Sequence, residues 1–367
     1  MHVPARRPDH RRPSFRERAV RAAASTAAMT AVLLAAGCAD TTPDRVRTPG
    51  FAPVTVTGCA GFESVIASPP RRVVALTPSV LELLLWLDLG DRVAALGTAP
   101  RPGALPQNLA GKAAAIPSLS GKYTAGSGYQ PVPREELLSV QPDLVIGGFS
   151  SNFDAPGAMS QKELAADGVP SYLALSTACE SAVTGPQTDF GLVWRDLDNL
   201  GRIFGVPDRA QKVVAQMKQK IAPVEAETAR LKDADRPTVF PFEYDEGTAT
   251  PYAPGNRQAI NAVIGKAGGR NLFGDQDKAY TKTGWEEVVA RDPQVILIVI
   301  YGKDGAAAND ARFAEAEKHL LDSPVLRGVR AVADRRFARL IYEAASVGGV
   351  RNADAVVDLA AQLAPAG

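Results

Sequence analysis

Short apolar runs rich in β-branched residues alternate along the chain with segments whose apolar residues recur at helical spacing. Residues 72–76 predict a strand, and the leucines of residues 80–89 predict the helix that follows it. The same alternation predicts further strands at 93–96, 143–146, 171–175, 238–240, 295–300 and 337–341, and further helices at 161–168, 189–204, 258–267 and 352–363. Strands that alternate with helices are typical of an α/β fold with mainly parallel sheets.

A long helical segment separates two such regions. Residues 208–232 contain no glycine and follow Pro207, a residue that suits the first turn of a helix. Pro223 is the only interruption and predicts a kink. We therefore expect two Rossmann-like α/β lobes joined by a single long helix. The expected boundaries are 59–206 for the N-terminal lobe, 207–234 for the bridging helix and 235–367 for the C-terminal lobe.

The two lobes share a weak internal repeat. Residues 135–146 align without gaps to residues 286–297, and both read Glu-Glu-apolar-apolar, three variable residues, Pro, a polar residue and an apolar run. Proline ends a helix and the apolar run begins a buried strand. Duplication of one lobe explains the match; the alternative is that any helix–proline–strand unit looks alike.

The N-terminus has the features of an export signal. Seven arginines lie among the first 21 residues, and an uncharged apolar run over 22–37 then reaches Cys38. The run has 16 residues, which is short for a membrane span. The tetrapeptide Ala35-Ala36-Gly37-Cys38 resembles the lipobox of bacterial lipoproteins. We expect a signal peptide at 1–37, a lipidated Cys38 with a flexible tether over 38–58, and anchoring to the outer face of the cytoplasmic membrane. A plain signal peptide is the alternative, and the Sec and twin-arginine routes both stay open.

Charge and cysteine counts narrow the partners. The chain has 41 Lys and Arg against 40 Asp and Glu, so there is no basic excess to bind a nucleic-acid backbone. Without residues 1–37, 34 basic and 38 acidic residues remain. Lipidation of Cys38 would leave Cys59 and Cys179, which predict a disulfide outside the cytoplasm. Two free buried thiols are the alternative.

Catalytic and metal-binding motifs are scarce. After the predicted signal the only histidine is His319, whose charged neighbours predict a solvated position on a helix. The sequence has no HExxH, GxSxG, P-loop or GxGxxG motif, and one histidine is too few for an imidazole metal site. We expect no catalytic residues, no cofactor and no resident metal, although an iron site of tyrosines and carboxylates stays open.

The order of signal, lipobox, tether, lobe, helix and lobe resembles the substrate-binding lipoproteins of ABC importers for iron–siderophores, haem and cobalamin. The likeness covers nearly all of residues 59–363. The segments that carry it are 72–79, 87–93, 135–146, 200–204, 267–273, 285–294 and 331–336. Pro223, in the bridging helix, departs from the family pattern.

The resemblance implies a binding function without catalysis. The protein would be a monomer whose two lobes close only slightly on the ligand. It would capture a metal chelate, with a ferric siderophore as the favoured ligand, and deliver it to an ABC permease dimer. A cobalamin, cobinamide or haem binder is the alternative within the class. A secreted, lipid-anchored α/β hydrolase is the alternative from another class, and a structural or adhesive lipoprotein is a third.

The resemblance also implies site residues. Glutamates in the first turn of a helix on each lobe would dock to the permease; the matching residues are Glu135 and Glu286, with adjacent Glu136 and Glu287 leaving the register open by one. Ligand would lie between the lobes, at loops that follow the carboxyl ends of strands. The polar and aromatic residues of those loops are Ser79, Arg101, Tyr123, Tyr129, Phe149, Phe153, Tyr244, Tyr252, Arg257, Tyr280, Tyr301 and Arg351.

Overall fold

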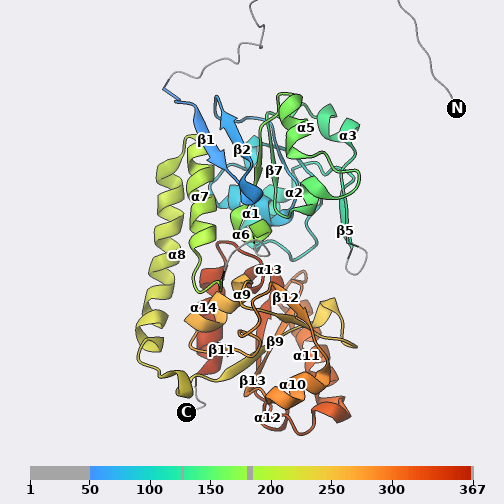
Figure 1. The fold of residues 1–367 in the computed structure, drawn as a ribbon, viewed down its shortest axis with the longest axis vertical. Helices are drawn as coiled ribbons and strands as arrows, with labels where there is room; N and C mark the ends of the chain where they lie inside the picture. The colour runs from blue at the N-terminus through green and yellow to red at the C-terminus, as the bar shows by residue number, and fades with distance from the viewer. Residues whose placement is uncertain (1–49, 125–127, 180–184, 365–367) are drawn as a thin grey trace, which may run out of the picture. The chain divides into compact units, whose positions relative to one another are not determined.

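Two α/β lobes and a long helix beside them make up the described part of the chain (Figure 1). A computed structural model describes residues 50–124, 128–179 and 185–364. The predicted signal peptide and Cys38 lie outside these residues. Among the residues described, no helix is both long and apolar enough to cross a bilayer.

The N-terminal lobe is built on a four-stranded parallel sheet in the order β4-β3-β7-β8. Its strands are β3 (Val73–Ala75), β4 (Val93–Leu96), β7 (Leu144–Gly147) and β8 (Ser171–Leu173). Its helices are α1 (Pro78–Trp86), α2 (Gln107–Ala114), α3 (Arg134–Ser139), α4 (Ser151–Asp154), α5 (Gln161–Ala166) and α6 (Leu175–Ala178). Every residue of β3 and β7 is buried, which explains their continuous apolar sequences.

The C-terminal lobe repeats this plan with the order β11-β9-β13-β14, again all parallel. Its strands are β9 (Thr238–Glu243), β11 (Arg270–Asn271), β13 (Val295–Ile300) and β14 (Phe337–Ile341). Its helices are α9 (Ala259–Lys266), α10 (Trp285–Arg291), α11 (Ala306–Asp322), α12 (Arg330–Ala333), α13 (Tyr342–Ala345) and α14 (Asn352–Leu363). The fold is therefore the expected mixed α/β fold with a parallel sheet in each lobe.

Three antiparallel strand pairs and several short turns were not predicted. Two are hairpins, which pair β1 (Val54–Thr57) with β2 (Glu63–Ile66) and β5 (Lys122–Thr124) with β6 (Gly128–Gln130). The third joins β10 (Tyr252–Pro254) to β12 (Tyr280–Lys282), which are separated in sequence by α9 and β11. The 3-10 turns are η1 (Cys59–Gly61), η2 (Gly90–Arg92), η4 (Asp233–Asp235), η5 (Tyr244–Glu246) and η6 (Pro324–Leu326). Strands of two to four residues are too short to show a reliable alternating pattern.

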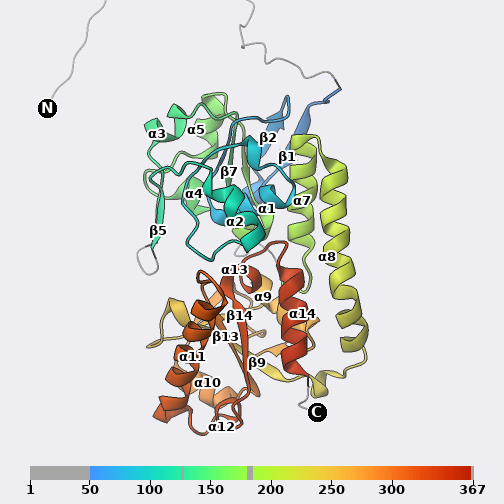
Figure 2. The same cartoon turned by 180° about the vertical axis from the view of Figure 1, so that it is seen from behind.

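Helices α7 (Gly191–Phe204) and α8 (Pro207–Thr228) form a hairpin at one side of the lobes. Gly205 ends α7 in the left-handed conformation, at φ +68°, and Pro207 opens α8. Helix α8 continues through Pro223, and it lies alongside both lobes in both views (Figures 1 and 2). It packs against α7, α9 and α14. The bridging element therefore contacts helices of both halves of the chain.

The loops of the two lobes approach each other backbone to backbone. A Cβ atom at Gly103, whose φ is +82°, would lie 2.1 Å from the carbonyl oxygen of Lys303. A Cβ atom at Gly348 would lie 2.4 Å from the carbonyl oxygen of Ser176. Only glycine permits these two approaches, so the lobes are held close at the edge where their strands end.

A disulfide joins Cys59 to Cys179, the pairing expected from the sequence, with a Cα–Cα distance of 5.4 Å. The bond ties η1 to the end of α6 across 120 residues. We expect the double substitution Cys59→Ser and Cys179→Ser to lower the free energy of unfolding by about 2–5 kcal/mol, because the unfolded chain loses a long-range constraint. Urea unfolding of both proteins measures the change. Two titratable thiols in a denatured, otherwise unaltered Cys38→Ala protein would contradict the bond.

Candidate functional site

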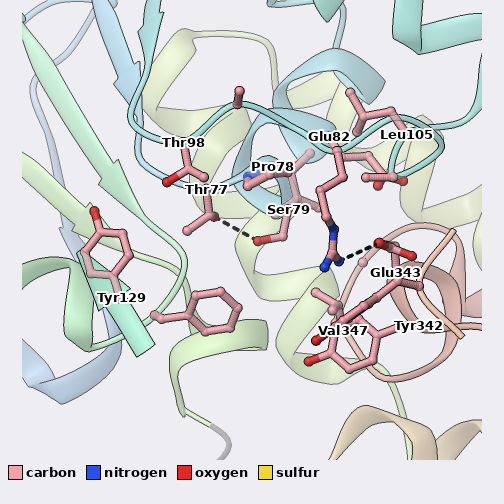
Figure 3. Close-up of a pocket in the computed structure, with 18 of the residues that line it drawn as sticks. Thr77, Pro78, Ser79, Glu82, Thr98, Leu105, Tyr129, Tyr342, Glu343 and Val347 are labelled. Carbon is pink, nitrogen blue, oxygen red and sulfur yellow. Dashed lines mark hydrogen bonds and ion pairs between the residues drawn. The ribbon is translucent and has the colours of Figure 1, made fainter. Parts of the chain in front are cut away.

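A cavity of about 420 Å³ lies between the two lobes, at the carboxyl ends of both sheets (Figure 3). Its N-terminal lobe wall comes from α1 and from the segments that follow β3, β4 and β7, with Tyr129 of β6. Its lining residues from this lobe are Thr77, Pro78, Ser79, Glu82, Leu83, Thr98, Ala99, Arg101, Ala104, Leu105, Tyr129, Phe149 and Ser151. Those from the C-terminal lobe are Tyr280, Tyr301, Tyr342, Glu343, Val347, Gly348, Gly349 and Val350. The volume falls within the range of small-molecule sites.

Hydroxyl groups line the N-terminal wall. Thr77 caps α1, since its Oγ1 accepts a hydrogen bond from the Val80 backbone N–H, and it lies 2.9 Å from Ser79 Oγ. Thr98 Oγ1 is buried and has no hydrogen-bond partner among the described residues. These groups offer donors and acceptors to the polar edge of a ligand.

Aromatic side chains from both lobes also line the cavity. Tyr301 and Tyr342 meet edge to face, with ring centroids 4.9 Å apart, and the guanidinium of Arg101 stacks 3.6 Å above the Tyr301 ring. Phe149 is a large apolar residue that stays 36% exposed. Burial raises the pKa of Tyr129, so this tyrosine is neutral at physiological pH. Such side chains combine large apolar area with polar tips.

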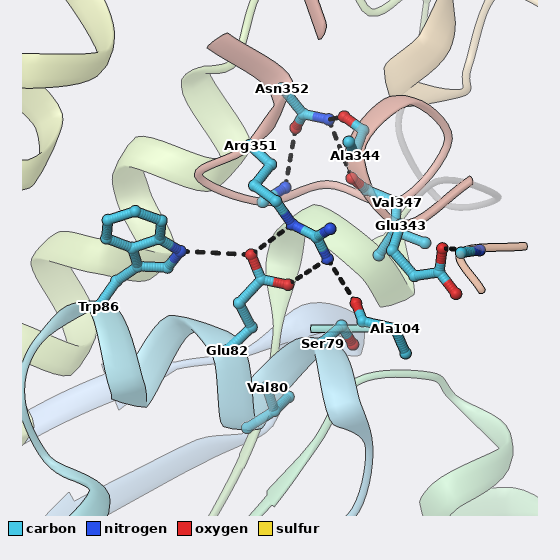
Figure 4. A network of polar contacts seen from close by, with 12 residues as sticks. Ser79, Val80, Glu82, Trp86, Ala104, Glu343, Ala344, Val347, Arg351 and Asn352 are labelled. Atoms are coloured by element: carbon cyan, nitrogen blue, oxygen red, sulfur yellow. Dashed lines mark hydrogen bonds and ion pairs between the residues drawn. The ribbon is translucent and has the colours of Figure 1, made fainter. Parts of the chain in front are cut away.

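A buried ion pair connects the lobes at the edge of the cavity (Figure 4). Arg351 Nε lies 2.8 Å from Glu82 Oε1, and its Nη2 lies 2.7 Å from Glu82 Oε2. The same Nη2 donates to the carbonyl oxygen of Ala104 at 2.7 Å, and Trp86 Nε1 donates to Glu82 Oε1 at 3.2 Å. Both side chains of the pair are less than 10% exposed. The bidentate geometry fixes α1 against the start of α14.

A second, more exposed ion pair also crosses between the lobes. Arg101 Nη2 lies 3.1 Å from Glu343 Oε1, and Glu343 Oε2 accepts a hydrogen bond from the Gly302 backbone N–H at 3.0 Å. The Arg101 side chain is 48% exposed, whereas that of Glu343 is 13% exposed. The carboxylate is therefore held on the wall of the cavity.

Glu243, at the end of β9, is a buried carboxyl group behind the cavity. Its Oε1 accepts hydrogen bonds from Ser346 Oγ at 2.7 Å and from Tyr280 Oη at 3.3 Å. Burial raises the pKa of Glu243 from 4.5 to about 7. The protonation state of Glu243 is thus coupled to Tyr280, which lines the cavity.

This shift predicts a pH dependence of stability. Between pH 4.5 and about 7 the unfolded chain releases the Glu243 proton while the folded chain keeps it, so stability falls as the pH rises through this window. The loss amounts to about 3 kcal/mol. We expect Glu243→Gln to remove this part of the slope, measured by urea unfolding across the window, while Glu286→Gln, at an exposed carboxylate, retains it. An unchanged slope in Glu243→Gln would contradict the assignment.

The cavity brings together half of the residues that the sequence nominated for ligand binding. Those in its lining are Ser79, Arg101, Tyr129, Phe149, Tyr280 and Tyr301. For Tyr123 the structure describes the backbone alone, which pairs with Tyr129 in the β5–β6 hairpin.

The remaining nominated residues lie outside the lining and have other partners. Phe153 packs in the core of the N-terminal lobe, and Tyr244 meets Phe242 edge to face, with ring centroids 5.9 Å apart. Tyr252 contacts the Tyr280 ring, Arg257 pairs with Asp277 at 2.7 Å, and Arg351 pairs with Glu82. Position after a strand did not distinguish residues that face the cavity from residues that pack beside it.

Sequence reasoning missed several lining residues. Tyr342 directly follows the predicted strand 337–341. The strand-end rule, which nominates residues just after the carboxyl end of a strand, was therefore sufficient to find it. Glu82 lies inside a predicted helix, and nothing in the sequence shows that its carboxylate meets Arg351. Thr77 and Thr98 also follow strands, but threonine is too common in loops to stand out.

The four glutamates of the internal repeat differ in their contacts. Glu136 accepts a hydrogen bond from the Ser120 backbone N–H at 2.8 Å, and Glu287 pairs with Arg291 at 2.8 Å. Glu135 and Glu286 are exposed in the first turns of α3 and α10, with no ion pair or hydrogen bond to another described residue. In each pair, one glutamate therefore has no hydrogen-bond or ion-pair partner among the described residues.

The expectation of a solvated His319 was wrong. This residue is half-buried on α11, and its ring lies 6.3 Å from that of Phe242, 6.0 Å from that of Tyr244 and 6.4 Å from that of Trp285. The charged residues that flank it in sequence point elsewhere on the helix, because neighbours in sequence lie on different helix faces. His319 is not part of the cavity lining.

Comparison with known proteins identifies the family. A sequence profile of the periplasmic binding protein family matches residues 73–342, so the chain belongs to that family of extracytoplasmic, substrate-binding transport proteins. Proteins similar to this chain include ones named for vitamin B12, haem and Fe3+-hydroxamate.

Three similar proteins illustrate this. The vitamin B12-binding protein of Photorhabdus laumondii is 22% identical over 239 residues, which cover 65% of this chain and 74% of that protein. A solved structure of an ABC-type Fe3+-hydroxamate transport system from Saccharomonospora viridis gives a TM-score of 0.67 at 22% identity, covering 84% of this chain and 98% of that one. A solved structure of a periplasmic haem-binding protein from Roseiflexus sp. RS-1 gives a TM-score of 0.59 at 24% identity, covering 80% of this chain and 98% of that one.

Proposed function

We propose that this protein is the extracytoplasmic solute-binding component of an ABC importer, and that it captures an iron–siderophore complex in the inter-lobe cavity. The observation that carries the proposal is the cavity itself, which is lined by tyrosines and hydroxyl groups at the carboxyl ends of two parallel sheets. Parallel α/β sheets bind ligands at this edge. The relative named for Fe3+-hydroxamate transport supports the choice of ligand.

The side chains of the cavity suit the organic shell of a chelate. Tyr301, Tyr342 and Phe149 offer apolar faces, and Ser79 and Thr98 offer hydroxyl groups. The chelator would supply all ligands to the iron, and the protein would contact only the outer surface of the chelate. The buried Glu82–Arg351 pair, by restricting lobe movement, would keep closure on the ligand small.

Cobalamin and haem are the second candidates, because relatives named for vitamin B12 and haem share the fold. A hydrolase is less well supported. Residues 38–367 contain one histidine, His319, and it packs among aromatic rings away from the cavity. Among the residues that the structure describes, no Ser–His pair therefore lies at the cavity.

We also propose that Glu135 and Glu286 dock the protein to the permease dimer. Their neighbours Glu136 and Glu287 are engaged within the protein, which favours the register stated here. Lipidation at Cys38 would tether a monomer to the membrane beside its permease.

Tryptophan fluorescence tests the binding function. Trp86 is hydrogen-bonded to Glu82, a lining residue, so a bound chromophoric chelate should quench it. We expect one-to-one saturable quenching by a ferric siderophore, with no turnover of generic esters. Trp86→Phe should reduce the quenching amplitude and leave the affinity unchanged. A folded protein that binds no ferric siderophore, haem or cobalamin would refute the proposal.

A further inference from the structure

We infer that the cavity selects chelates without net negative charge, and that Glu343 is the residue that sets this selectivity. The inference rests on the proposed function, since it names the charge class of the ligand that the same cavity takes. It follows from the state of the two arginines at the cavity, each of which already has a carboxylate partner.

Arg351 is fully engaged within the protein. Its Nε and Nη2 bind both oxygens of Glu82, at 2.8 and 2.7 Å, and Nη2 also donates to the Ala104 carbonyl oxygen. The pair is nearly inaccessible to solvent. An anionic ligand would have to displace a buried carboxylate to reach this guanidinium, and would leave that carboxylate unpaired.

Arg101 is accessible, but its charge is also balanced. It pairs with Glu343 and stacks on Tyr301, so one face of the guanidinium is covered. Burial raises the pKa of Glu246, and the positive charge of Arg101 acts on that carboxyl in the opposite direction, which places Glu246 within electrostatic range of Arg101. Arg101 therefore has two carboxyl groups near it.

The other basic groups of the neighbouring loops do not alter this balance. Lys303 and Arg312 both pair with Asp245, at the amino end of the loop after β9, and neither lines the cavity. The two guanidiniums at the cavity are thus near three carboxyl groups: Arg351 is paired with Glu82, and Arg101 is near Glu343 and Glu246. Around the cavity, positive charge is not in excess.

This balance discriminates between kinds of chelate. Three hydroxamate groups, each with a single negative charge, neutralise Fe3+, whereas catecholate groups carry two charges each and leave their ferric complex anionic. A carboxylate such as Glu343 repels an anion more strongly in a partly desolvated cavity than in water. We expect the protein to bind a neutral or cationic ferric hydroxamate at least about tenfold more tightly than an anionic ferric catecholate.

The test uses the purified full-length protein and three probes: ferrichrome (neutral), ferrioxamine B (cationic) and the ferric tris-complex of 2,3-dihydroxybenzoate (anionic). Glu343→Gln retains an acceptor for the Gly302 N–H but releases Arg101. We expect this variant to bind the anionic probe more tightly. Its preference for the neutral and cationic probes over the anionic probe should therefore be severalfold smaller than that of the wild type. Glu246→Gln should act in the same direction. Glu317→Gln, at a carboxylate that pairs with Arg339 outside the cavity, is the matched control and should keep the wild-type preference.

Two results would overturn the inference while leaving the transport function intact: saturable binding that favours the anionic probe, or a preference that neither Glu343→Gln nor Glu246→Gln changes. Absence of binding by every chelate, with the protein folded, would refute the proposed function and this inference together.

Discussion

Replacing both Glu135 and Glu286 with alanine is expected to abolish uptake of the chelate and to leave its affinity for the protein unchanged. Both carboxylates are exposed in the first turns of helices α3 and α10, and neither belongs to the cavity lining. Two charged groups, one on each lobe, can fix the orientation of the protein on a two-fold symmetric permease dimer. Their loss removes contacts that form only in the complex with the permease. Uptake of labelled chelate by cells that express the permease, together with titration of the purified variant, measures both quantities.

Glu287→Ala provides the matched control for this experiment. Glu287 lies on the same helix as Glu286 but pairs with Arg291, so its loss should leave uptake near the wild-type rate. Normal uptake by the Glu135→Ala, Glu286→Ala double variant would refute the docking assignment. If Glu287→Ala lost uptake and Glu286→Ala kept it, the docking residue on this helix would be Glu287 instead of Glu286.

Replacing Arg351 with leucine is expected to lower the free energy of unfolding by about 3–5 kcal/mol. The substitution leaves the Glu82 carboxylate buried, with Trp86 as its only remaining partner among the bonds described above. Removing one partner of a buried pair is costly because the other charge stays desolvated. Urea unfolding monitored by fluorescence measures the loss.

The double variant Glu82→Leu, Arg351→Leu tests the cause. It contains no unpaired charge, so it should be more stable than Arg351→Leu alone. Lys318→Ala breaks a surface pair with Asp322 on α11 and should cost no more than about 1 kcal/mol. A loss of less than about 1 kcal/mol in Arg351→Leu would contradict the role given to the buried pair.

Buried strands were predictable from the sequence, and hairpins were not. Strand β13 matches the predicted range 295–300, because a strand covered on both faces must be apolar at every position. The β10–β12 pair joins residues 26 to 30 positions apart over three residues per strand, so no local pattern marks it. Helix α8 begins at Pro207, where the bridging helix was expected to begin, and ends at Thr228, whereas the expected range extended to residue 234.

The site was predictable in its location more than in its members. The strand-end rule found Arg101 and Tyr301, which meet across the cavity. It also nominated Arg351, whose guanidinium is bound by Glu82 instead. Which residue faces a cavity depends on contacts between lobes distant in sequence, as in the pairing of residues 82 and 351, and one sequence does not encode such contacts in a readable pattern.

The most direct test of the central claim is the crystal structure of the protein with the chelate that binds most tightly in the fluorescence titration. We predict electron density for one chelate between the lobes, in contact with Ser79, Arg101 and Tyr301. Density for the chelate on an outer surface, with the cavity closed to it, would contradict the account.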